Sequence, residues 1–149
     1  MFRLPVPIVR IAIIAAVALG ALFFRDRISG GAGDLKAGDC FDNPAATIEV
    51  RDVQHHPCTE PHTSEVVFVG TMPSADAYPT DAQFSSYVSE ACVPGFNAYT
   101  GLDFMSLPAI DMGYFIPTTD GWGNGDRSVI CYAVRTDDSM INASLKAAS

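Results

Sequence analysis

Hydrophobic residues form one long run near the N-terminus and shorter periodic groups in the rest of the chain. The run is Val6–Phe24, nineteen residues in which Arg10 is the only charged side chain. A helix of that length rises about 28 Å, close to the thickness of a membrane's hydrocarbon core. The pattern therefore predicts a single transmembrane helix, so that residues 1–24 form a short N-terminal tail and a membrane anchor.

A cleaved signal peptide is the alternative interpretation of this run. Ala16-Val17-Ala18 offers the small residues at which signal peptides are cut. The apolar stretch up to that point would be only eight residues long, and Leu19–Phe24 would stay exposed after cleavage. The length of the run favours an uncleaved anchor. Residues 25–34, which combine charges and glycines, are expected to form a flexible linker, and residues 35–149 one folded domain.

Within that domain, apolar and polar residues alternate with the period of a β-strand in two places. Glu65–Gly70 and Ser128–Val134 are both rich in β-branched and aromatic residues, and Thr47–Arg51 is a weaker case. The runs are short and lie in a chain with many turn-forming residues. We expect them to be strands of a small antiparallel sheet.

A helix is expected between these strands. Thr80 and Gln83 have the spacing of a capping box, and apolar residues then recur at helical intervals. Pro94 and Gly95 interrupt the pattern, so the helix is either kinked there or ends near Val93. Together the patterns predict an α+β fold, with one main helix packed on one face of the sheet. The apolar positions are Phe84, Val88, Ala91, Cys92, Phe96 and Tyr99.

All four cysteines, Cys40, Cys58, Cys92 and Cys131, follow the anchor. An even number of cysteines in a small domain is typical of disulfides, which persist in oxidising compartments. Loop charges on the two sides of the anchor are nearly balanced, so the cysteines decide the orientation and place the domain outside the cytoplasmic membrane. Three connectivities are possible. Our hypothesis pairs helical Cys92 with Cys131, which leaves Cys40 with Cys58.

The charge of the domain excludes some classes of partner. Residues 35–149 contain fifteen acidic and five basic side chains, a net charge of −10. Such a domain repels phosphate backbones and anionic lipid surfaces. We therefore expect no nucleic acid among its partners, and a membrane attachment that depends on the anchor.

Three segments of the domain carry recognisable motifs. They are Gly38-Asp39-Cys40-Phe41, Cys58-Thr59-Glu60-Pro61-His62-Thr63-Ser64-Glu65-Val66, and Pro117-Thr118 through Trp122 to Gly125-Asp126-Arg127-Ser128-Val129-Ile130-Cys131. These segments resemble the septum formation domain family of actinobacterial envelope proteins. The resemblance implies an extracytoplasmic domain, usually tethered to the membrane, with a part in septum formation and no established catalytic activity. Two departures from the family pattern, His55-His56 and the longer connection Gly101–Gly113, are candidate marks of a particular partner.

Histidines around one cysteine suggest a metal site. His55, His56, Cys58 and His62 have spacings that a zinc or copper ion could use. That site would require Cys58 as a thiolate and would leave Cys40 unpaired in an oxidising compartment. A disulfide flanked by loop histidines is the preferred interpretation, and no metal or cofactor is predicted.

Four residues are candidates for contact with a partner: His62, Trp122, Asp126 and Arg127. Each also has a structural interpretation. His62 would lie in a turn and hydrogen-bond the backbone or a carboxylate, while Trp122 would cap the core, with Asp126 and Arg127 bracing the glycine-rich turn. Glu60 and Glu65 are expected to be surface carboxylates.

No motif of an enzyme is present in the sequence. Ser64 and His62 lack a strand-turn-helix elbow of the Gly-x-Ser-x-Gly type, and phosphate-binding and dinucleotide-binding loops are absent. We therefore expect a non-enzymatic single-pass membrane protein whose extracytoplasmic domain contacts envelope proteins, such as those of the divisome. The alternatives are an accessory subunit of a respiratory or secretion complex, and a domain that binds a small envelope ligand in a pocket.

Overall fold

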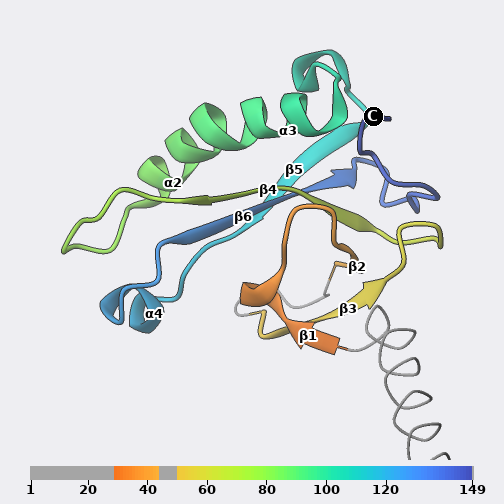
Figure 1. Cartoon of the computed structure of the whole chain (residues 1–149). Helices are drawn as coiled ribbons and strands as arrows, with labels where there is room; N and C mark the ends of the chain where they lie inside the picture. The colour runs from red at the N-terminus through yellow and green to blue at the C-terminus, as the bar shows by residue number, and fades with distance from the viewer. Residues whose placement is uncertain (1–28, 44–49, 149) are drawn as a thin grey trace, which may run out of the picture.

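The computed structural model describes residues 29–43 and 50–148, and within them six strands form one antiparallel sheet (Figure 1). The anchor predicted in residues 1–24 lies outside the described residues. No helix in the described part of the chain has both the length and the apolar character needed to cross a membrane. The strands, in the spatial order β1-β3-β2-β4-β6-β5, are β1 (Ser29–Gly31), β3 (Asp52–His56), β2 (Cys40–Asp42), β4 (Ser64–Thr71), β6 (Ser128–Arg135) and β5 (Ile110–Phe115).

The two long central strands, β4 and β6, are those that the alternating pattern predicts most clearly. They pair from Ser64↔Val134 to Thr71↔Ser128, with a bulge between Val66 and Phe68. The strand expected over Thr47–Arg51 lies mostly in residues 44–49, outside the described residues. The structure places a strand just after it, at β3.

One helical layer covers one face of the sheet (Figure 1). It consists of α2 (Asp81–Tyr87), a π-helical turn η3 (Val88–Cys92) and α3 (Val93–Thr100). The capping box of Thr80 and Gln83 is confirmed, with both reciprocal hydrogen bonds present. Of the two alternatives for Pro94 and Gly95, the one in which the helix ends near Val93 is wrong. The helical layer continues into α3, because the Val93 N–H bonds the carbonyl five residues back and this wide turn accommodates Pro94.

Apolar side chains pack on both faces of the sheet. On the helix side they form a core with Phe84 and Phe96 from the helical layer, and on the opposite face Phe41 and Tyr132 pack edge to face. The alternation along β4 and β6 explains this division, because neighbouring residues point to opposite faces. A short helix, α4 (Thr119–Gly123), adds Trp122 to the helix-side core.

The two disulfides confirm the hypothesised pairing. Cys92 of η3 is bonded to Cys131 of β6, with Cα atoms 5.9 Å apart, and this bridge ties the helical layer to the sheet. Cys40 of β2 is bonded to Cys58 in the β3–β4 connection, with Cα atoms 5.3 Å apart. Both Cys92 and Cys131 are completely buried, as their positions on the two facing apolar surfaces require.

The fold begins earlier than the sequence predicts. Ser29–Gly31 pair with β3 as strand β1, and the N–H of Ala32 donates a 2.8 Å hydrogen bond to the carbonyl of Arg51. Ala32 and Leu35 are both buried in the core opposite the helices. Residues 29–34 therefore belong to the fold and not to the flexible linker expected there. This strand, Ser-Gly-Gly, has no alternation of apolar and polar side chains, so the sequence pattern could not predict it.

Candidate functional site

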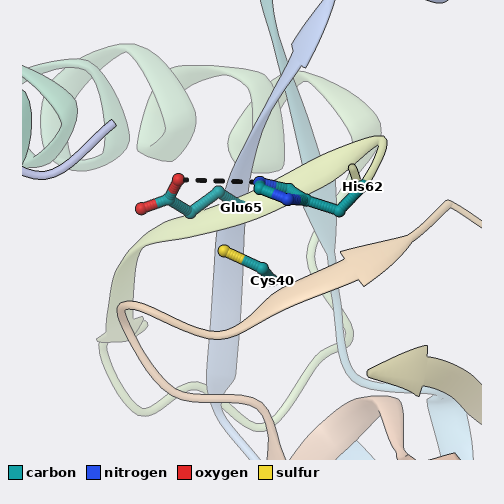
Figure 2. A group of neighbouring side chains, drawn as sticks. All are labelled: Cys40, His62 and Glu65. Atoms are coloured by element: carbon teal, nitrogen blue, oxygen red, sulfur yellow. Dashed lines mark ion pairs between the residues drawn. The ribbon is translucent and has the colours of Figure 1, made fainter. Parts of the chain in front are cut away.

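Polar side chains are buried together where β4 begins. His62, Ser64 and Glu65 are each 0% exposed, and Cys40 of β2 is 1% exposed. Cys40 lies beside His62 and Glu65 (Figure 2). The sheet positions these groups, since Cys40 pairs directly with Glu65 and His62 forms an isolated bridge with Ile141. The name Glu65 cluster is used below for five residues. They are Cys40, His62 and Glu65, together with Tyr99 and Ser144, which hydrogen-bond Glu65. Buried polar groups of this kind need partners inside the protein.

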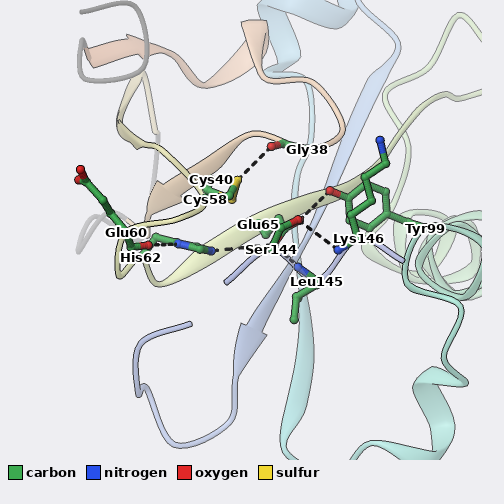
Figure 3. The surroundings of a disulfide bond; sticks show 10 residues. All are labelled: Gly38, Cys40, Cys58, Glu60, His62, Glu65, Tyr99, Ser144, Leu145 and Lys146. Carbon is green, nitrogen blue, oxygen red and sulfur yellow. Dashed lines mark hydrogen bonds and ion pairs between the residues drawn. A yellow bond between two sulfur atoms is a disulfide. The ribbon is translucent and has the colours of Figure 1, made fainter. Parts of the chain in front are cut away.

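Glu65 obtains its partners from two distant segments (Figure 3). One carboxylate oxygen, Oε1, accepts hydrogen bonds from the hydroxyls of Tyr99 at 2.6 Å and Ser144 at 2.7 Å. The other, Oε2, accepts one from the N–H of Leu145 at 2.7 Å. The expectation of a surface carboxylate is therefore wrong. The position of Glu65 in the sequence could have indicated its burial. Glu65 stands directly before the apolar Val66-Val67-Phe68 and shares a strand face with Val67.

The C-terminal segment is held on the sheet through this cluster. His62 and Ile141 exchange two backbone hydrogen bonds of 3.0 and 2.8 Å, and Ala147 N–H donates to the carbonyl of Tyr99 at 3.0 Å. Together with the bonds from Ser144 and Leu145 to Glu65, they fix residues 141–147 against β4 and α3. The cluster therefore joins three parts of the chain that are far apart in sequence.

His62 has one satisfied and one unsatisfied ring nitrogen. Its Nδ1 lies 2.7 Å from the carbonyl oxygen of Glu60, which can only accept, so Nδ1 carries the proton. Its Nε2 lies 3.9 Å from Glu65 Oε2 and has no hydrogen-bond partner. The structural interpretation of His62, a turn residue bonded to the backbone, is confirmed. Its buried ring is not available to a partner, contrary to the expectation of a surface contact.

Tyr99 holds its hydroxyl proton more firmly than an exposed tyrosine does. Burial raises the pKa of its hydroxyl well above the usual value, and the hydrogen bond to the Glu65 carboxylate raises it further. Ionised Tyr99 would place a second negative charge beside a buried carboxylate. The hydroxyl therefore acts as a donor to Glu65 throughout the neutral range.

The metal site considered as an alternative for His55, His56, Cys58 and His62 is not assembled, and Cys58 is instead bonded to Cys40. His55 and His56 follow one another on β3 and so point to opposite faces, and His56 Nε2 lies 2.8 Å from Asp42 Oδ2. In the described residues a different set comes together: a ligand atom of Cys40, one of His62 and one of Glu65 lie within 4.8 Å of one another. Cys40 is, however, half of a disulfide.

Trp122 and Arg127 form a second polar site. Trp122 is 3% exposed, and the Arg127 guanidinium lies 3.7 Å from the centre of its ring. Nη1 of Arg127 donates to the carbonyl of Trp122 at 2.6 Å, and Trp122 Nε1 donates to Ala75 at 3.1 Å. Asp126 accepts a 2.9 Å bond from Ser128 N–H. The interpretation of Trp122 as a core cap is confirmed, and its ring is not exposed for binding.

The candidate contact residues do not surround one cavity. His62 precedes the β4 end that pairs with Val134, whereas Arg127 and Trp122 lie at the other end of β4 and β6, beside the Thr71↔Ser128 pair. A depression of about 170 Å³ does lie at the Cys40–Cys58 disulfide. It is lined by Gly38, Asp39, Cys40, His55, His56, Pro57 and Cys58.

Comparison with known proteins gives one finding. A family model described as septum formation matches residues 37–148, which is nearly all of the domain described above. A comparison with curated proteins gave no match, and a comparison with solved structures gave none either.

Proposed function

Because this chain belongs to the septum formation family, we propose that it acts in septum formation as a membrane-tethered domain outside the cytoplasm. In this proposal the domain contacts other envelope proteins and catalyses no reaction. The observation that carries the proposal is the family match, which extends from just before β2 to the C-terminal segment held by Glu65. The match thus includes both disulfides and every strand except β1, and is not limited to an isolated motif.

The location rests on the disulfides and on the N-terminal run. Both bridges are parts of the fold, and disulfides need an oxidising compartment to form and persist. The fold begins at Ser29, only four residues after the apolar run ends at Phe24. Four extended residues span at most about 14 Å. If Val6–Phe24 is a membrane anchor, it holds this domain at the membrane surface.

The interaction role is supported by exposed apolar side chains on β5 and in the connection that leads to it from α3. Met105 is 80% exposed and Leu102 is 51% exposed, both in this connection. We expect the connection to be one of the two departures from the family pattern. β5 is the last strand of the sheet within the described residues, and Tyr114 near its end is 38% exposed. Exposed apolar side chains near an edge strand are suited to protein contact, and Met is enriched in interfaces.

The proposal is tested by purifying the full-length chain from its native membrane in mild detergent and identifying what accompanies it by mass spectrometry. Divisome proteins are expected with the natural chain. The double variant Leu102→Ser, Met105→Ser is expected to lose them, whereas the matched control Met140→Ser, also a methionine with substantial exposure, keeps them. Stoichiometric respiratory or secretion subunits would reassign the chain as an accessory subunit. Absence of any protein partner would contradict an interaction role.

A further inference from the structure

We propose that reduction of the Cys40–Cys58 disulfide converts the Glu65 cluster into a zinc site. Its ligands are Sγ of Cys40 and Cys58, Nε2 of His62 and one carboxylate oxygen, Oε2, of Glu65. Two thiolates, an imidazole and a carboxylate are a tetrahedral zinc set. This site is independent of the role in septum formation and goes beyond it.

The distances already approach those of a metal site. The ligand atoms of Cys40, His62 and Glu65 lie within 4.8 Å of one another, and His62 Nε2 is 3.9 Å from Glu65 Oε2. Ligand atoms bonded to one tetrahedral zinc lie roughly 3.3–3.8 Å apart, given bonds of about 2.0–2.3 Å. Cys58 Sγ is bonded to Cys40 Sγ, so after reduction a rotation about its side chain keeps it within reach. The longest of these distances therefore needs to shorten by about 1–1.5 Å.

The second ring nitrogen of His62 is prepared for a ligand role. Its Nε2 is completely buried, directed at Glu65 and without a hydrogen-bond partner (Figure 2). Its Nδ1–H is held by the carbonyl of Glu60, which leaves the lone pair on Nε2. Metal-binding histidines typically donate their other N–H in this way. An unpaired buried nitrogen costs stability in the disulfide form, and a metal ion would remove that cost.

Glu65 is oriented for the same role. Tyr99 and Ser144 both donate to Oε1, while Oε2 accepts only the Leu145 N–H among the hydrogen bonds recorded for it. A carboxylate oxygen can accept two hydrogen bonds, so Oε2 keeps a lone pair toward His62. The three donors fix the carboxylate as outer-shell groups do in metal sites. Zinc would thus join β2, β4 and the C-terminal segment when the disulfide is open.

The chemistry needs a two-electron reductant, for which we name a dithiol. One of its thiolates attacks Sγ of Cys58, a half-buried residue that lines the depression of about 170 Å³, and the sulfur of the buried residue Cys40 leaves. The second thiol then displaces Cys58 and the dithiol departs as its own disulfide. Cys40 and Cys58 each gain an electron and a proton, and zinc binding releases both thiol protons.

The test measures zinc binding by the full-length chain in mild detergent. A phosphine is used as reductant, because a dithiol would compete for zinc; the phosphine is oxidised with an oxygen atom from water. Competition with a chromogenic chelator is expected to show about one zinc ion per reduced chain and none on the oxidised chain. The variant Cys92→Ala, Cys131→Ala excludes the other cysteine pair and is expected to bind zinc equally. Zinc uptake by the oxidised chain, or none by the reduced chain, would overturn the proposal.

Two variants separate the ligand set from neighbouring histidines. His62→Gln is expected to weaken zinc binding by more than about tenfold, whereas His56→Gln on β3 is expected to leave the affinity unchanged. Because misfolding of His62→Gln would also abolish zinc binding, the reduced natural chain is also titrated with Co²⁺. Thiolate-to-cobalt charge transfer and strong tetrahedral d–d absorption are expected. Weak octahedral absorption without charge transfer would overturn the proposal irrespective of any variant.

Discussion

The hydroxyl of Tyr99 donates a 2.6 Å hydrogen bond to the carboxylate of Glu65 in the interior of the domain. Tyr99 stands near the end of α3 and Glu65 near the start of β4, so the bond ties the helical layer to the sheet. Ser144 donates to the same oxygen, which ties the C-terminal segment to both. Removing this carboxylate should therefore loosen the helix and the C-terminal segment together.

Glu65→Gln is expected to lower the free energy of unfolding by about 2–4 kcal/mol, because the amide replaces one acceptor with a donor that faces other donors. Glu90→Gln is the control, since Glu90 is an exposed helical residue whose carboxylate bonds only Ser86 in the structure's recorded contacts. Its effect should stay within about 0.5 kcal/mol. Urea unfolding of the disulfide-intact chain, followed by the fluorescence of the single Trp122, measures both. Equal effects would contradict the role of Glu65.

Stability is expected to fall as the pH rises above about 10. Burial, and then the hydrogen bond to Glu65, raises the pKa of Tyr99 in the folded state, so the folded chain holds this proton after the unfolded chain has lost it. The stabilisation that comes from the raised pKa of Tyr99 is complete below the unfolded-state pKa of about 10. It is lost progressively as the pH rises from there toward the folded-state pKa. Tyr99→Phe should flatten this decline and Tyr114→Phe should not. The midpoints of urea unfolding across the alkaline range measure this loss of stability. Equal declines in Tyr99→Phe and Tyr114→Phe would refute the attribution of the loss to Tyr99.

Arg127→Lys is expected to destabilise the domain by about 1–2 kcal/mol. The guanidinium lies over the Trp122 ring and donates to the carbonyls of Trp122, Asp126 and Ala75, an arrangement that an ammonium group cannot reproduce. Arg135→Lys is the matched control, because its recorded ion pair with Asp137 lies at the surface. Thermal unfolding followed by Trp122 fluorescence compares the two. A control variant as unstable as Arg127→Lys would show that the stacked geometry is unimportant.

Gly95→Ala is expected to cost about 1–3 kcal/mol, although alanine is the better helix former. A Cβ at Gly95 would lie 2.6 Å from ring atoms of Phe68, so α3 could no longer approach β4 as closely. Gly123→Ala in α4 is the control, since its Cβ would meet nothing within 4 Å. Urea unfolding should show the control to be neutral or slightly more stable. A neutral Gly95→Ala would mean that the helix shifts without cost.

Local patterns in the sequence predicted the parts of the fold that local interactions determine. The capping box needs only Thr80 and Gln83, and each central strand reveals its buried face by its own alternation. The pairing of Cys92 with Cys131 followed because each cysteine lies on an apolar surface that faces the other. The septum formation family was likewise recognisable from the motifs around the cysteines.

Long-range contacts explain what the sequence could not predict. Glu65 is buried because Tyr99 and Ser144, 34 and 79 residues further along the chain, supply its donors. Strands β1 and β2 have three residues each, too few to show a period. In the π turn before Pro94, a backbone N–H bonds the carbonyl five residues back and not four. The spacing of apolar residues in the sequence does not reveal this difference.

Whether this domain acts in septum formation is measured by following the full-length chain in dividing cells. A fluorescent protein that folds in oxidising compartments is fused to the C-terminus, and its distribution is recorded through the division cycle beside that of a uniform membrane stain. We expect enrichment at the septum over the lateral envelope while the septum forms. Uniform distribution along the envelope throughout the cycle would refute a role in septum formation.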